Sequence, residues 1–135
     1  ALNIIQVSKF SMHDAMLLSE RIQKGGLIAI AGDRVPLMWG HTIPVQFLGS
    51  GADLPQGPYM LAKALGCPLF TLMAIKVAGN YQLSCRKISD AGGSIQFKSI
   101  DEAAQDFANT LEEGCLKSPF QWFNFYPFWQ PATHE

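Results

Sequence analysis

The sequence predicts an α/β fold, an incomplete α/β sandwich in which a mixed sheet is flanked by helices. Short apolar segments typical of strands alternate with segments whose apolar residues recur at helical spacing. Of the 135 residues, 48% are hydrophobic and only 16% are charged, which is typical of a chain with a packed core. We therefore expect residues 1–135 to form a single domain.

The first elements predict a β-α-β unit. Residues 3–7 are rich in β-branched side chains and predict a strand. Ser11 and Asp14 match a capping box, and the helix that they begin should end at a pair of glycines after residue 24. Residues 27–31 are continuously apolar, as in a strand that is buried on both faces of an α/β sheet.

The middle of the chain predicts an edge strand, a loop and a short helix. Residues 43–48 alternate in polarity, and Pro44 within them is typical of a strand at the edge of a sheet. Residues 49–57 are rich in glycine and proline and predict a loop. Residues 59–65 predict a helix with a proline in its first turn and Gly66 at its end.

The last third predicts a hairpin and a long helix. Residues 68–77 and 81–88 resemble two antiparallel strands joined by a Gly-Asn turn. Ser99 and Glu102 match a second capping box, where the long helix begins. The apolar face of this helix comprises Ala104, Phe107, Ala108, Leu111 and Cys115.

Seven aromatic residues are concentrated near the end of the chain. They could contact lipid or pack across the sheet, and we favour packing because large aromatic side chains are how small domains build their cores. The polar atoms of the Tyr and Trp side chains should then find hydrogen-bond partners. The seven are Phe120, Trp122, Phe123, Phe125, Tyr126, Phe128 and Trp129.

Charge and cysteine content argue against several classes of protein. The formal net charge is −1 and no basic run occurs, which argues against a nucleic-acid partner. No run reaches the ~18 consecutive apolar residues of a spanning helix. Cys67, Cys85 and Cys115 are odd in number and form no C-x-x-C pair, so we expect three buried free thiols rather than disulfides or a zinc site. No metal and no cofactor is predicted.

Gly32, Asp33 and Arg34 follow the predicted strand at residues 27–31, and the ends of strands are where open α/β sheets bind ligands. A guanidinium suits a phosphate or carboxylate, and a neighbouring carboxylate can hold it in place. Asp33 and Arg34 could instead simply pair with neighbours at the strand end. His41 lies in the next loop and could contact an acidic headgroup, although a surface histidine without such a role is more common.

Four segments occur in the order in which the lysophospholipid acyltransferase superfamily uses them. They are residues 29–36 (AIAGDRVP), 43–49 (IPVQFLG), 55–58 (PQGP) and 121–126 (QWFNFY). Residues 67–72 (CPLFTL) resemble a further block of that family, a proline-containing apolar strand. Together they cover essentially the whole chain, which most resembles the branch of lipid A lauroyl and myristoyl acyltransferases.

The resemblance implies transfer of a fatty acyl group from an acyl carrier protein or CoA thioester to a membrane lipid or glycolipid, such as lipid A. It implies that Asp33 and Arg34 help to bind the acyl acceptor. It also implies that the enzyme acts at the membrane surface, on the cytoplasmic face of the bacterial inner membrane, and that it uses no metal or cofactor.

One family signature is missing. The family uses a His, four residues and then Asp or Glu, in which the histidine deprotonates the acceptor and the carboxylate orients it. At that spacing His13 is followed by Leu18 and His41 by Gln46. We therefore assign no catalytic residue to this chain. We expect it to be the C-terminal portion of an acyltransferase domain, inactive alone, with the N-terminal catalytic segment absent.

Two alternatives remain open: a degenerate, non-catalytic paralogue, and a lipid- or acyl-binding module or subunit without chemistry. The high apolar content also suggests a surface that is normally covered by a membrane or by further protein. We expect the isolated chain to self-associate through an exposed sheet edge.

Overall fold

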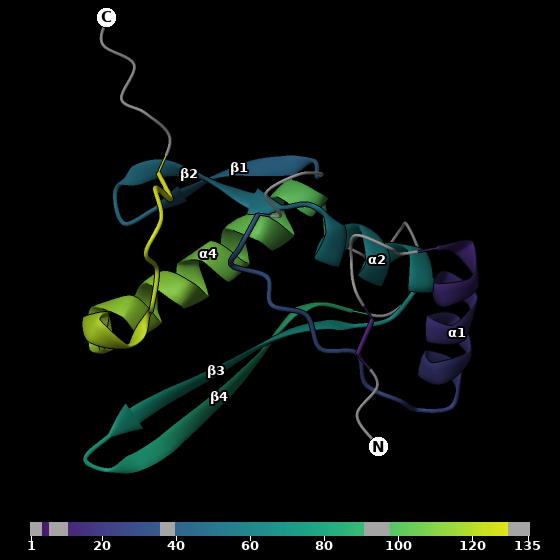
Figure 1. The fold of residues 1–135 in the computed structure, drawn as a ribbon, viewed down its shortest axis with the longest axis horizontal. Helices are drawn as coiled ribbons and strands as arrows, with labels where there is room; N and C mark the ends of the chain where they lie inside the picture. The colour runs from purple at the N-terminus through teal and green to yellow at the C-terminus, as the bar shows by residue number, and fades with distance from the viewer. Residues whose placement is uncertain (1–3, 6–10, 36–39, 91–97, 130–135) are drawn as a thin grey trace, which may run out of the picture.

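Figure 1 shows the computed structural model of the chain, which describes residues 4–5, 11–35, 40–90 and 98–129. These parts contain three α-helices and two small antiparallel sheets, so the predicted α/β class is confirmed. Helix α4 (Ile100–Lys117) lies between two β-hairpins (Figure 1). Each hairpin is a separate two-stranded sheet, whereas the sequence predicted one mixed sheet. The result is an incomplete sandwich with a helix at its centre.

The first hairpin joins strands β1 (Thr42–Phe47) and β2 (Ser50–Pro55). Its turn residues Leu48 (φ 51°) and Gly49 (φ 79°) are both left-handed, as a two-residue type I′ turn requires. The strand predicted at residues 43–48 is confirmed, shifted by one residue. The loop predicted at residues 49–57 is wrong for β2, because its glycines belong to a tight hairpin rather than to an irregular loop.

The core lies between β1 and α4. Every second residue of β1 is buried, and Phe47 and Ile43 are among the largest fully buried side chains. The facing side of α4 has Ala103 and Ala104, both 0% exposed. These small residues let the strand approach the helix closely, so that the bulky strand residues fill the space between them.

The second hairpin joins β3 (Leu69–Val77) and β4 (Asn80–Ser89), and both predicted strands are confirmed. Its turn is formed by Ala78 (φ 49°) and Gly79 (φ 85°), one residue earlier than the predicted Gly-Asn pair. Both turn residues again have the positive φ of a type I′ turn. The turn end of this hairpin projects away from α1 and α2 (Figure 1).

The three predicted helices are confirmed. Helix α1 (Met12–Gln23) and α4 each begin with the predicted capping box. Helix α2 (Gly57–Leu65) ends at Gly66, whose left-handed φ of 62° is suited to glycine. Helix α1 buries only Leu18 and stands beside α2 at one end of the molecule (Figure 1). None of the described helices is long and apolar enough to cross a bilayer.

The buried strand predicted at residues 27–31 is wrong. This segment forms no strand, and Leu27 is 85% exposed and Ile30 is 46% exposed. An apolar sequence becomes a buried strand only beside a paired neighbour, and no described strand pairs with this segment. Of the strand predicted at residues 3–7, only Ile4 and Ile5 lie within the described residues, and they are not in a strand.

Candidate functional site

Three separate segments, residues 30–34, residues 40–41 and residues 55–60 at the start of α2, border a cavity of about 370 Å³. Its lining is largely apolar, with one arginine and one histidine. The lining includes Ile30, Arg34, His41, Gln56, Pro58 and Met60. The cavity therefore combines an apolar wall with basic side chains, which is the general composition of a site for an amphiphilic ligand.

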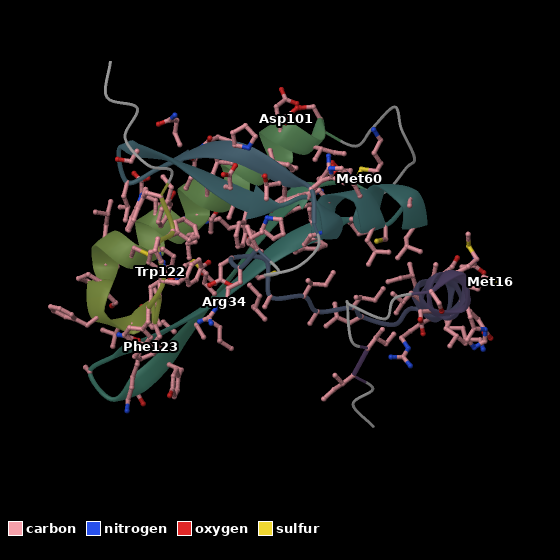
Figure 2. The ribbon with its side chains drawn as sticks, turned by 45° about the horizontal axis from the view of Figure 1, so that its top comes forward. Met16, Arg34, Met60, Asp101, Trp122 and Phe123 are labelled. Carbon is pink, nitrogen blue, oxygen red and sulfur yellow. The ribbon has the colours of Figure 1, made fainter. Side chains whose placement is uncertain are left out.

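Arg34 is exposed at this cavity and is also attached to the C-terminal segment. Its Nη2 donates a hydrogen bond to the Phe123 carbonyl oxygen at 3.1 Å. Figure 2 shows Arg34 close to the labelled Phe123 and Trp122. Within the described residues Arg34 forms no ion pair, so the bond to Phe123 uses only one of the five N–H donors of its guanidinium.

Asp33 faces the C-terminal segment rather than the cavity. The Trp122 Nε1 donates to Asp33 Oδ2 at 3.3 Å, and the Tyr126 hydroxyl donates to the Asp33 carbonyl oxygen at 3.2 Å. Burial, together with the negative charge of Asp33, raises the pKa of Tyr126. Asp33 therefore binds two aromatic side chains that follow α4, and it does not line the cavity.

The other two predicted site residues, His41 and Gly32, lie in different places. His41 is exposed and lines the cavity, and its carbonyl oxygen accepts a hydrogen bond from the Gln56 N–H at 2.9 Å, at the start of α2. Gly32 lies against α4, where a Cβ added to it would meet the Phe107 ring at 3.5 Å. The structure thus brings Arg34 and His41 together and places Gly32 and Asp33 against α4 and the C-terminal segment.

The aromatic residues after α4 divide into two groups. Trp122 and Phe128 pack edge-on against Phe47, with ring centroids 5.1 Å and 5.3 Å from it. In contrast, Phe120 is 93% exposed and Phe125 is 90% exposed. The predicted packing across the sheet is confirmed for the first group and wrong for the second, whose rings face solvent.

Sequence reasoning missed Gln56, Pro58 and Met60 as lining residues. Residues 55–58 formed one of the four family-like segments, but the sequence assigned no role to them. Met60 is 47% exposed and lies beside Arg34 only through the fold, so no signal in the sequence could have found it. The expectation of three buried thiols is also wrong, since Cys115 is buried but Cys85 is exposed.

In the parts of the chain that the structure describes, no three His, Cys, Asp or Glu side chains are grouped as metal ligands would be.

A comparison with models of known protein families gives no match, and a comparison with curated proteins gives none either. The resemblance to acyltransferases therefore stays a prediction from the sequence.

Proposed function

We propose that this chain is part of an acyltransferase. The enzyme moves a fatty acyl group from an acyl carrier protein or CoA thioester to a membrane lipid or glycolipid, at the cytoplasmic face of a bacterial inner membrane. In this proposal the chain contributes acceptor binding through Arg34 and His41. The cavity that these two residues border is the observation that supports it most.

The size and lining of the cavity agree with part of a lipid. Ligand sites commonly occupy about 300–1,000 Å³, and this cavity of about 370 Å³ is at the lower end. It has room for a headgroup and the adjoining part of an acyl chain, but not for a whole lipid. Ile30 and Met60 supply apolar contacts, and the planar guanidinium of Arg34 suits an anionic oxygen group.

Replacement of Arg34 should therefore weaken the binding of an anionic amphiphile. The probe is a short-chain phosphatidic acid below its micelle concentration, measured by isothermal titration calorimetry against the 135-residue chain. Loss of one charge-assisted contact should raise the Kd by about tenfold or more in Arg34→Ala. Arg34→Lys should lose less, since it keeps the charge but not the planar fork.

Two controls test whether the effect is specific to Arg34 and to the negative charge of the lipid. Lys24→Ala removes a cation at the residue that follows α1, which is paired with Glu20 and lies outside the cavity lining, and it should leave the Kd unchanged. A short-chain phosphatidylcholine, which has no net charge, should bind less tightly than the phosphatidic acid. Equal affinity of the Arg34→Ala variant and the unaltered chain would remove the support for this site.

The catalytic base is proposed to lie outside these 135 residues. Neither His13 nor His41 is followed by a carboxylate at the spacing of the family signature. We therefore expect no acyl transfer when the purified chain is mixed with an acyl-CoA and a lysophospholipid. Product is measured by mass spectrometry, and catalytic turnover above the rate without protein would contradict this assignment.

The same missing signature supports a second candidate, a lipid- or acyl-binding module without chemistry. The two proposals differ in what the gene encodes. An in-frame His-x4-Asp/Glu segment before Ala1 would support the acyltransferase. A natural protein that begins near Ala1 would support the binding module. Lipid binding by Arg34 is expected in both cases, so the calorimetry tests the site and the reading frame tests the chemistry.

A further inference from the structure

The outer edges of β1 and β2 are covered by other parts of the chain. On β1, Pro44 has no N–H to offer, and the Gln105 side chain of α4 bonds both the N–H and the carbonyl of Gln46, at 2.9 Å each. On β2, Ala52 forms a bridge with Trp129 of the C-terminal segment. Unpaired strand edges are sites of unwanted pairing, and proteins commonly block them in these ways.

The outer edge of β3 is blocked in the same manner at Lys76, near its turn, whereas its other outward residues, Phe70, Leu72 and Ala74, have no such contact with the described residues. The Gln121 side chain accepts from the Lys76 N–H and donates to the Lys76 carbonyl, at 2.7 Å each. This contact also shows which backbone groups point outward. In an antiparallel pair they alternate along the strand, so the residue opposite Lys76, which is Tyr81, also points its N–H and carbonyl outward.

Within the described chain, the outer edge of β4 has no blocking contact at any of its outward residues. By the same alternation, its outward backbone groups belong to Tyr81, Leu83, Cys85 and Lys87. No described residue forms a hydrogen bond with these groups. All residues from 80 to 87 are exposed, and the strand contains no proline. As far as the described residues show, this edge is therefore open over most of its length.

Apolar side chains lie on one face of the hairpin beside this edge, together with Lys87. Leu83 and Tyr81 are each 71% exposed, and Leu72 of β3, which lies opposite the exposed Cys85, is 72% exposed. They share the face of the hairpin that points away from α4. An exposed edge strand with open backbone groups and apolar side chains on one face is a template for another strand.

We propose that a second copy of this chain pairs with β4, antiparallel, with the two-fold axis at Ser84. In this register Tyr81 lies opposite Lys87 of the other copy, and Leu83 lies opposite Cys85. Each of the four outward residues of one copy then lies opposite an outward residue of the other copy. Each of these four pairs exchanges two hydrogen bonds, so about eight bonds form between the copies. Moving the axis by one residue leaves an outward residue of each copy unpaired.

The side chains favour the same register. An ammonium group opposite an aromatic ring and two apolar side chains opposite each other are favourable cross-strand pairs. Arg86 lies opposite the neutral Gln82 of the other copy. Moving the axis to Arg86 would place two arginines opposite each other, and like charges in that position are unfavourable. The strand is therefore self-complementary in the register centred on Ser84, which is why a second copy is the occupant that we propose.

The test replaces Leu83 and Cys85, which lie opposite each other across the proposed interface, with charged residues. The double variant Leu83→Lys/Cys85→Lys places like charges opposite each other twice across the axis, and it should raise the dimer dissociation constant by about tenfold or more. The matched variant Leu83→Lys/Cys85→Glu places opposite charges there and should dimerise again. Analytical ultracentrifugation of the full 135-residue chain is performed with a reductant, so that no dimer is a disulfide of Cys85.

Circular dichroism accompanies both double variants, and the Lys/Glu variant keeps the test valid if the Lys/Lys variant folds poorly. Two results would overturn the proposal. One is an unaltered chain that stays monomeric up to high micromolar concentration. The other is a dimer whose dissociation constant is the same in both variants, which would place the contact on another surface.

Discussion

Replacing Phe47 with alanine should lower the free energy of unfolding by about 3–5 kcal/mol, the usual cost of deleting a buried phenylalanine. Phe47 is 1% exposed at the end of β1 and contacts Trp122, Phe128 and Trp129, whose ring centroids lie 5.1, 5.3 and 6.2 Å away. The ring therefore joins the first hairpin to the C-terminal segment. Since domains of this size have about 5–15 kcal/mol in all, this loss is a large part of the total.

The effect is measured by urea denaturation, followed by circular dichroism and by tryptophan fluorescence. The fluorescence of the native state should shift to the red, because Trp122 and Trp129 lose the ring that they pack against. Phe125→Ala is the matched control: its ring is 90% exposed, and such surface changes usually stay within about 0.5 kcal/mol. Equal destabilisation by the two substitutions would mean that Phe47 does not organise this core.

Elements with a local signal could be predicted from the sequence. The capping boxes at Ser11 and Ser99 mark the starts of α1 and α4, and Gly66 marks the end of α2. Each of these signals acts through hydrogen bonds or backbone angles within a few residues. The tight turn at Gly79 was predicted to within one residue for the same reason.

Features that depend on distant partners could not be predicted in this way. Residues 27–31 have the composition of a buried strand, but composition does not show whether a neighbouring strand pairs with them. Likewise, β2 contains Gly51 and Pro55, and its apolar and polar residues alternate only weakly. The sequence therefore did not indicate that β2 pairs with β1, which the structure shows.

At the candidate site, too, some residues could be predicted from local signals, whereas the position of another depends on a distant partner. Arg34 and His41 were predicted as site residues because of their chemistry and their place in the sequence, and both line the cavity. The position of Asp33 depends on a partner 89 residues away, Trp122, which no local pattern could indicate. The sequence predicted that Asp33 and Arg34 act together on the ligand. In the structure both residues bond the C-terminal segment, and only Arg34 also lines the cavity.

Replacing Asp33 with alanine should therefore destabilise the fold before it affects ligand contacts. The partly buried Trp122 Nε1 would lose its acceptor, and an unsatisfied donor of this kind costs about 1–3 kcal/mol. The Tyr126 hydroxyl bonds the Asp33 backbone and would keep its partner. Asp33→Asn retains an acceptor oxygen for Trp122 and should cost less than Asp33→Ala, which makes it the matched control.

Urea denaturation measures this cost, and calorimetry with the short-chain phosphatidic acid separates the two roles. A residue that only holds the C-terminal segment should leave the Kd of the folded Asp33→Asn variant near its original value, whereas Arg34→Ala should raise it. The two side chains are coupled through that segment, because Arg34 bonds the Phe123 carbonyl one residue after Trp122. A large rise in Kd for Asp33→Asn, without loss of stability, would show that the carboxylate itself meets the ligand and would restore Asp33 to the site.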